Sequence, residues 1–187
     1  MPRHADPDLE ARILTVAWNL WKKGGEKALT MLSVARAAGT TTPTLYERFR
    51  NREQILLALL RHMQRDLFET LKHARSPEEF CERYLDFAVR HPHEYELYHV
   101  SWEGKREALE KSKPSIELLH GRLAEWLGAT AKGHDSVWLA MWSLLHGAAM
   151  LLISRTIDHK TSSELRVACC DAVRTLVRHK SDGKGDK

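Results

Sequence analysis

The helical spacing of apolar residues is the feature that most narrows the folds open to this chain. Five residues at positions i, i+4, i+8, i+11 and i+12 share one face of a predicted first helix: Leu9, Ile13, Ala17, Leu20 and Trp21. This helix is expected to end at Gly24 and Gly25, because glycine disfavours a helix interior. No segment shows the alternating apolar pattern of a strand. We therefore predict an all-α fold.

Caps and breakers divide the rest of the chain into helices. Thr30 and Thr41 are predicted N-caps of two short helices, with Gly39 supplying the left-handed backbone of the turn between them. Asn51 is the expected cap of a long fourth helix that runs to about Arg75. Five further helices are expected at about 77–90, 93–103, 114–129, 135–157 and 162–179.

The composition and the distribution of charge limit the classes of protein. The chain has 187 residues, of which 43% are hydrophobic and 29% are charged, as in a soluble globular protein. Residues 1–75 hold 13 Lys and Arg against 8 Asp and Glu, a net charge of +5, whereas residues 76–187 hold 16 against 17. The basic part of the chain indicates an anionic partner such as nucleic acid.

Cysteine usage favours a reducing compartment. The three cysteines are an odd number, and the neighbours Cys169 and Cys170 point about 100° apart on a helix, so we expect them to pack rather than to pair. The first residues lack the apolar segment of a secretion signal. We expect a cytoplasmic protein.

One uncharged segment has nearly the length that a membrane span needs. Residues 136–154 carry no formal charge over nineteen positions, although Ser143, His146 and Gly147 interrupt the second half. A helix buried on most sides, within a bundle and against a second subunit, gives the same pattern. We predict that helix and no membrane contact.

The two short helices and their glycine turn, supported by a longer first helix, fit a helix-turn-helix. The second helix must then enter the major groove of DNA, and it begins with the hydroxyls of Thr41, Thr42 and Thr44, which can meet base edges and phosphates. Tyr46 and Arg48 follow on the same helix. By spacing alone, another three-helix unit with a threonine-rich cap fits equally well.

The segment from Leu29 to Leu56 closely resembles the helix-turn-helix of TetR/AcrR-family transcriptional regulators. The matching motifs, in order, are Ala37-Ala38-Gly39, Thr44-Leu45-Tyr46, Phe49 and Arg52-Glu53. The resemblance implies that Tyr46 and Arg52 hold phosphates, although the family usually has Lys in place of Arg52 and an aliphatic residue in place of Thr40. The candidate DNA-binding residues are Thr30, Thr40, Thr41, Thr42, Pro43, Thr44, Tyr46, Arg48, Arg50 and Arg52.

The C-terminal helices vary within this family, where they bind a small ligand and form the dimer. Trp142, His146 and Gly147 resemble a Trp…His-Gly signature of one group of these domains. The apolar faces of the last two predicted helices could form a four-helix interface between two subunits. A pocket also needs apolar walls with a few polar groups. The candidate ligand-binding residues are Phe87, Tyr95, Tyr98, His99, Trp102, Trp126, Trp138, Trp142 and His146.

Two other classes of function stay open at this point. Glu96 with His99 and Glu117 with His120 form two Glu-x-x-His motifs, and a ferritin-like di-iron site needs two such motifs plus inward Glu residues. A zinc site at His91, His93 and His99 lacks helical geometry. A helical adaptor that uses the first helices for protein contacts differs from a DNA-binding protein in its salt dependence.

The sequence therefore predicts a homodimeric DNA-binding transcriptional regulator, a repressor that a small, apolar or aromatic ligand releases from a palindromic operator. We expect no enzymatic activity, no cofactor and no metal. The predicted domains are a DNA-binding domain at 6–66, a ligand-binding and dimerisation domain at 67–180, and a frayed tail at 181–187. The fourth helix would couple the two domains, because it joins them.

Overall fold

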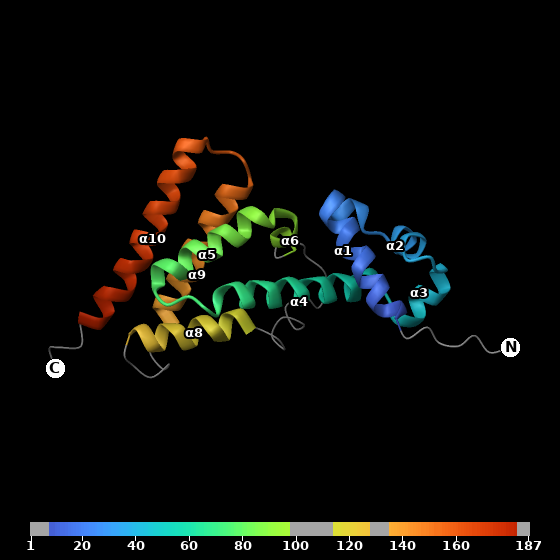
Figure 1. Ribbon diagram of the computed structural model, residues 1–187, viewed down its shortest axis with the longest axis horizontal. Coiled ribbons are helices and arrows are strands. Elements are labelled where there is room, and N and C mark those ends of the chain that lie inside the picture. Colours follow the sequence, from blue (N-terminus) through green and yellow to red (C-terminus); the bar gives the residue numbers. More distant parts are fainter. Residues whose placement is uncertain (1–7, 98–113, 128–134, 183–187) are drawn as a thin grey trace. The chain divides into compact units, whose positions relative to one another are not determined.

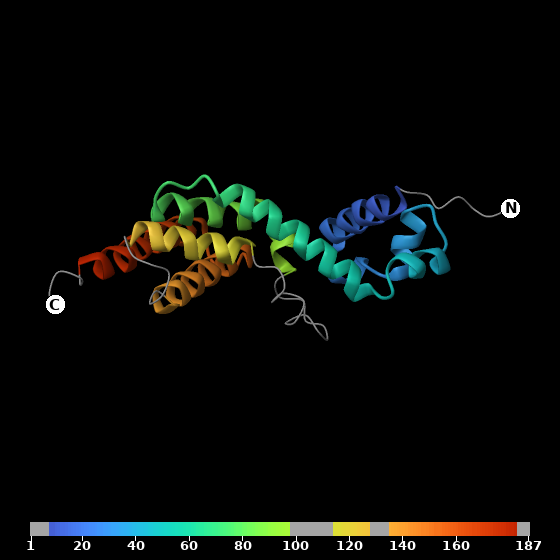
Figure 2. The ribbon, with the colours of Figure 1, turned by 90° about the horizontal axis from the view of Figure 1, so that it is seen from below.

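The computed structural model describes residues 8–97, 114–127 and 135–182. Every secondary-structure element in these three stretches is a helix, which confirms the all-α prediction (Figures 1 and 2). The helices are α1 (Leu9–Ala28), α2 (Met31–Ala37), α3 (Thr42–Arg48), α4 (Arg52–Leu71), α5 (Pro77–Arg90), α6 (Pro92–Glu96), α8 (Pro114–Trp126), α9 (Asp135–Ile153) and α10 (His159–Asp182).

Most predicted helix boundaries agree with these to within a few residues. α4 stops at Leu71 rather than near Arg75, and α10 extends beyond both predicted ends. The helix predicted at 93–103 is described only as α6, which ends at Glu96, and its remainder from residue 98 lies outside the described residues. The tail from residue 183 also lies outside them.

The described residues belong to two compact units. The first takes those of Met1–Met63 and His93–Ser112, and the second takes those of Gln64–Pro92 and Lys113–Lys187. α4 contributes to both units, because Met63 ends the first and Gln64 begins the second. α6 follows α5 in the chain, yet from His93 onward it belongs to the first unit.

The core of the first unit is built on the buried face of α1. Ile13, Ala17 and Trp21 are buried there as predicted, whereas Leu20 is only half-buried. The indole Nε1 of Trp21 donates a hydrogen bond to the backbone carbonyl of His93 at the start of α6. This bond gives a buried polar atom its partner and ties α6 to α1.

Side-chain caps fix the starts of the helices. Thr30 and Ser33 form a capping box at α2, in which each side chain binds the backbone N–H of the other residue. Asn51 Oδ1 accepts a hydrogen bond of 3.0 Å from the backbone N–H of Gln54 at the start of α4. Ser76 caps α5 in the same way. The caps at Thr30 and Asn51 are the ones that the sequence predicts.

The glycine pair in α1 ends the regular helix, also as predicted. Gly24 and Gly25 have non-helical backbone angles, and Gly25 has a φ of 57°, which residues other than glycine rarely adopt. One more helical turn follows as far as Ala28. The predicted stop is therefore a kink within α1.

The second unit is a helical bundle. α5 packs against α9 and α10, α9 packs against α10, and α8 packs against α9. α9 buries Val137, Met141, Leu145, Ala148 and Ala149. Only 28% of the apolar window of α9 is buried within the described part of this chain, on one face of the helix. The predicted burial of its other faces against a second subunit stays a prediction.

α9 also passes a test of length and composition for a membrane span. Among the described residues it is the one helix that does so, with a mean hydropathy of 1.7. A single helix of this kind is weak evidence for a membrane, because core helices of soluble proteins pass the same test.

Burial predicts the effect of two matched leucine substitutions in the first unit. Leu45 of α3 is 0% exposed and Leu32 of α2 is 60% exposed. Leu45→Ala should lower the free energy of unfolding by about 2–5 kcal/mol, because it leaves a cavity in the core. Leu32→Ala should change that free energy by less than about 0.5 kcal/mol. Urea unfolding of both variants measures the difference, and equal losses would contradict the core position of Leu45.

Candidate functional site

The turn between α2 and α3 is set by backbone hydrogen bonds around Gly39. The backbone N–H of Gly39 binds the carbonyl of Arg36, and that of Thr40 binds the carbonyl of Ala35 at 3.0 Å. This pair of bonds is a Schellman motif, which requires a left-handed residue after the helix. Gly39 supplies it with a φ of +64°. The turn therefore has a defined geometry, and it directs the start of α3.

An arginine on α1 holds this turn in place. Arg12 Nε donates a hydrogen bond of 3.0 Å to the backbone carbonyl of Ala38, at the end of α2. Sequence reasoning missed this role, because the two residues are 26 positions apart and no local pattern joins them. α1 thus supports the helix-turn-helix through a polar contact as well as through its apolar face.

α3 has one buried anchor and an exposed surface. Leu45 is buried, whereas Pro43, Tyr46 and Arg48 are exposed and Thr42 is half-buried. Tyr46 is a large side chain that remains 48% exposed. A helix held by one buried leucine leaves its other sides open to a partner, as entry into a DNA groove requires.

The threonines at the start of α3 first serve the helix itself. Thr41 Oγ1 accepts a hydrogen bond from the backbone N–H of Thr44 at 3.3 Å, and the two hydroxyls lie 2.9 Å apart. Thr41 is therefore the predicted N-cap. Whichever of the two hydroxyls donates to the other, each keeps a hydrogen or a lone pair for a further partner.

Arg52 is engaged within the first unit. Its Nε donates to the carbonyl of Leu29 at 2.8 Å, and its Nη2 donates to the carbonyl of Glu26 at 3.1 Å and to the carboxylate of Glu26 at 3.2 Å. The guanidinium fork thus closes the end of α1 onto the start of α4. Its predicted role as a phosphate ligand stays a prediction.

The remaining candidate DNA-binding residues lie around these helices. Thr30 is exposed and is engaged in the capping box of α2, and Thr40 is half-buried in the turn. Arg50 is exposed between α3 and α4. The structure thus brings the candidates into one small unit, and some of them also hold that unit together.

Three of the candidate ligand-binding residues lie in one aromatic stack in the second unit. Trp138, Trp142 and His146 follow one another along α9, with ring centroids 5.9 and 5.7 Å apart. His120 of α8 extends the stack, 4.8 Å from Trp138 and 15° from its plane. The Nε1 atom of Trp138 is buried and has no hydrogen-bond partner within the described stretches.

The other candidate ligand-binding residues do not join this stack. Phe87 is buried on α5 and lies against His91, and Tyr95 is buried in the first unit. Trp126 makes an edge contact with Phe80. Tyr98, His99 and Trp102 lie outside the described residues.

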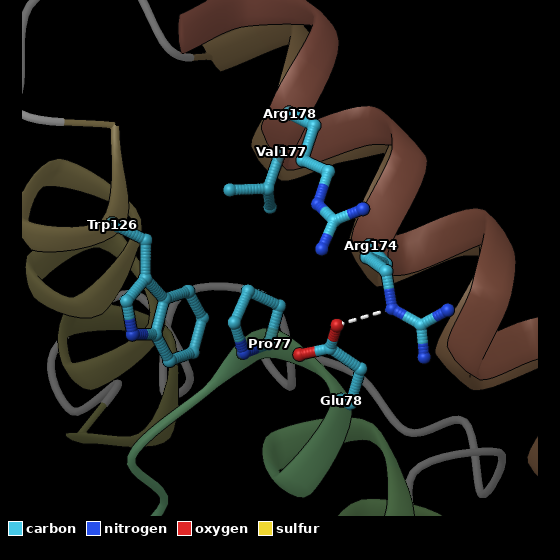
Figure 3. A pocket seen from close by; sticks show the side chains of 6 residues that line it. All are labelled: Pro77, Glu78, Trp126, Arg174, Val177 and Arg178. Atoms are coloured by element: carbon cyan, nitrogen blue, oxygen red, sulfur yellow. Dashed lines mark hydrogen bonds and ion pairs between the residues drawn. The ribbon is translucent and has the colours of Figure 1, made fainter.

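A surface cavity of about 260 Å³ opens beside Trp126 (Figure 3). Its lining combines one aromatic side chain, two small apolar groups, one acid and two bases: Trp126, Pro77, Val177, Glu78, Arg174 and Arg178. Except for Trp126, none of these residues is predicted from the sequence, because α5, α8 and α10 meet here from distant parts of the chain.

Glu78 and Arg174 form an ion pair across the cavity. Burial alone would raise the pKa of the Glu78 carboxyl, but hydrogen bonds from its own backbone N–H, from Arg174 and from Ser76 lower that pKa below its usual value. Glu78 therefore stabilises the fold at neutral pH, and this contribution is lost as the pH falls through the lowered pKa.

The described residues offer no group of three His, Cys, Asp or Glu side chains that could hold a metal ion. Glu117 is exposed on α8, and His120 of the same motif lies in the aromatic stack. His99 of the other motif lies outside the described residues. The described part of the chain thus gives the di-iron alternative no assembled site.

Comparisons with known proteins agree with this architecture. Residues 13–59 match the family model of bacterial regulatory proteins of the tetR family, and residues 78–176 match a tetracyclin repressor-like C-terminal domain. No curated protein matches the chain in sequence.

Several solved structures share the fold. A protein with unknown function from Rhodococcus sp. RHA1 is 21% identical with a TM-score of 0.74, covering 96% of this chain and 98% of its own. A tetR-family transcriptional regulator from Streptomyces coelicolor is 16% identical with a TM-score of 0.69, covering 94% and 89%. A TetR variant from Acinetobacter baumannii AYE in complex with minocycline is 15% identical with a TM-score of 0.62, covering 97% and 99%.

The helix-turn-helix and the two matched domains define the class: a DNA-binding transcriptional regulator with an all-α fold. The chain belongs to the tetR family of bacterial regulatory proteins. The resemblance that the sequence shows is thereby confirmed.

The contacts of Arg52 predict a loss of stability on a conservative change. Arg52→Lys keeps the charge but loses the fork that reaches both Leu29 and Glu26, so the free energy of unfolding should fall by about 1 kcal/mol. Arg50→Lys is the matched control on an exposed neighbour and should change it by less than about 0.5 kcal/mol. Chemical denaturation measures the free energy of unfolding of both variants. An unchanged unfolding midpoint for Arg52→Lys would show that the contacts of Arg52 with Leu29 and Glu26 do not stabilise the fold.

Proposed function

We propose that this regulator is a homodimeric repressor in the cytoplasm, which a small ligand releases from a palindromic operator. Its DNA-binding domain would span residues 6–66, its ligand-binding and dimerisation domain residues 67–180, and a tail residues 181–187. The exposed surface of α3 carries the proposal. α3 is fixed by Leu45 and by the Gly39 turn, and it presents Tyr46 and Arg48 on the basic part of the chain.

Selection of duplexes from a random DNA library tests the proposed operator. A dimer should enrich palindromes whose half-sites lie about one turn of DNA, roughly 34–36 Å, apart or one and a half turns apart. Affinity should fall steeply between low and high salt, because phosphate contacts release counterions. If the folded protein enriches no sequence from the library, the proposal of a specific operator is wrong.

Tyr46→Phe tests a single proposed phosphate contact. Tyr46 is exposed, so removal of its hydroxyl should leave folding intact. DNA binding should weaken about three- to tenfold, which is the effect of one hydrogen bond. The operator and unrelated duplexes should weaken alike, because a phosphate contact carries no sequence information. Fluorescence anisotropy measures both affinities. Tyr84→Phe in the second unit is the control, and unchanged binding by Tyr46→Phe would exclude the contact.

The proposed dimer uses the exposed face of α9 with α10. Leu139, Trp142 and Leu151 of α9 are 50%, 41% and 46% exposed, and Val167 of α10 is 62% exposed. No formal charge interrupts residues 136–154. A second copy of this chain would cover the face with an identical apolar face, because a two-fold interface pairs the same patch on both subunits.

Leu151→Glu tests this interface. A carboxylate in the centre of an apolar interface would lose its hydration, so the dimer should dissociate at concentrations where the original protein is dimeric. Sedimentation velocity measures the oligomeric state. Leu32→Glu places the same charge on an exposed leucine of the first unit and should leave the dimer intact. A dimeric Leu151→Glu protein would place the interface elsewhere.

The proposed ligand is an aromatic or apolar compound held in the second unit. The stacked rings of Trp138, Trp142 and His146 offer flat apolar surfaces. The buried Nε1 of Trp138 lacks a partner in the described part of the chain, and a ligand that accepts its hydrogen bond would recover a desolvation cost. The cavity at Trp126 is a second place for such a compound, with Arg174 and Arg178 suited to an acidic group.

Release would follow a shift between two populations of the dimer, one with recognition helices spaced for the operator and one without. α4 would couple the ligand to this shift, because its residues enter both units. α6 offers a second connection. Only His91 separates it from α5 along the chain, and its backbone accepts the hydrogen bond of Trp21.

A further inference from the structure

All three cysteines of the chain meet at the contact of α5 with α10. Cys81 Sγ and Cys169 Sγ lie 3.6 Å apart, and the two side chains are 0% and 1% exposed. Cys170 follows on α10 and is half-buried. From the sequence we predicted packing alone, because only the neighbouring residues Cys169 and Cys170 were considered as a pair. The partner of Cys169 in the structure is Cys81, which lies 88 positions away in the chain.

We propose that Cys81 and Cys169 are a site of reversible oxidation, at which a disulfide bond ties α5 to α10. A disulfide has a sulfur–sulfur length of about 2.0 Å, so the two sulfurs, now 3.6 Å apart, must approach by only about 1.6 Å. Rotation of the two side chains about their Cα–Cβ bonds supplies movement of this kind. The pair takes no part in the helix-turn-helix, in the aromatic stack or in the lining of the cavity at Trp126.

The direction of the hydrogen bond between Cys81 and Cys169 gives the two thiols different chemical roles. The Cys81 thiol donates its hydrogen bond to Cys169 Sγ, and this bond lowers the pKa of Cys169 against the opposing effect of burial. The hydrogen bond with Cys169 and burial both raise the pKa of Cys81. Cys169 is therefore the thiolate that attacks first, and Cys81 is the thiol that resolves the product.

Oxidation of two thiols to a disulfide requires an acceptor of two electrons and two protons. A hydroperoxide is a class of oxidant that accepts them. With hydrogen peroxide as the oxidant, the Cys169 thiolate attacks one peroxide oxygen and the O–O bond breaks, which forms a sulfenic acid. The other oxygen takes up the proton that the Cys169 thiol released on ionising and leaves as water. The Cys81 sulfur then attacks the sulfenic sulfur, the S–O bond breaks, and a second water leaves. The two thiols together lose two electrons and two protons, and the peroxide takes them up.

Burial controls when this reaction happens. Both sulfurs are shielded, so the oxidant reaches them only when α10 opens locally from α5. A reducing cytoplasm keeps such a pair as thiols until the oxidant rises. The bond would close a loop between positions 81 and 169 and would stabilise the folded chain against unfolding.

The test uses the full chain, purified with reductant and then treated with hydrogen peroxide in a reductant-free buffer. The intact mass should fall by about 2 Da, and peptide mapping without reduction should find Cys81 joined to Cys169. Cys170 should remain open to alkylation. The unfolding midpoint should rise on oxidation, and dithiothreitol should reverse both the mass change and the shift.

Alanine variants separate the three thiols. Cys170→Ala is the matched control and should still lose about 2 Da, whereas Cys81→Ala and Cys169→Ala should not. The map of the unaltered protein decides even if a variant fails to fold. A disulfide through Cys170, a disulfide between two chains, or thiols that survive peroxide unchanged would each overturn the proposal.

Discussion

Burial of one apolar stripe along α4 is the constraint on which both units depend. Ile55, Leu59, Met63, Leu67 and Leu71 recur every fourth residue and are almost completely buried. Each such side chain contributes about 1.5–3 kcal/mol when it leaves water. Because the boundary between the units falls within this stripe, between Met63 and Gln64, the first three of these residues belong to the core of the first unit and the last two to the core of the second.

Local chemistry explains why the helix-turn-helix could be predicted so closely from the sequence. The caps at Thr30 and Thr41 and the left-handed turn at Gly39 involve partners only a few residues away, so their spacing is visible in the chain. The contacts of Arg12 and Arg52 span more than twenty residues. No local pattern encodes them, and the predicted phosphate role of Arg52 took no account of its bonds to the end of α1.

The C-terminal unit shows the same division between local and distant information. Its helices follow from capping and periodicity. Trp138, Trp142 and His146 were predicted as ligand-binding candidates, and their spacing of four residues along α9 stacks their rings on one face. The approach of His120, the lining of the cavity and the meeting of Cys81 with Cys169 depend on how helices pack. The sequence of an apolar helix is also the same whether its own chain or a second copy buries it. Within the described part of this chain, burial accounts for one face of α9 only.

The shortness of α3 has a consequence for genetics. An isolated helix of seven residues is not stable in water, because helix formation needs a costly nucleus and about 12–15 residues to offset it. The second helix of the helix-turn-helix therefore exists only while Leu45 is docked in the core of the first unit. Destabilising substitutions throughout the first unit will therefore abolish DNA binding without altering a residue that contacts DNA, and a screen for lost DNA binding will recover folding defects alongside true contact residues.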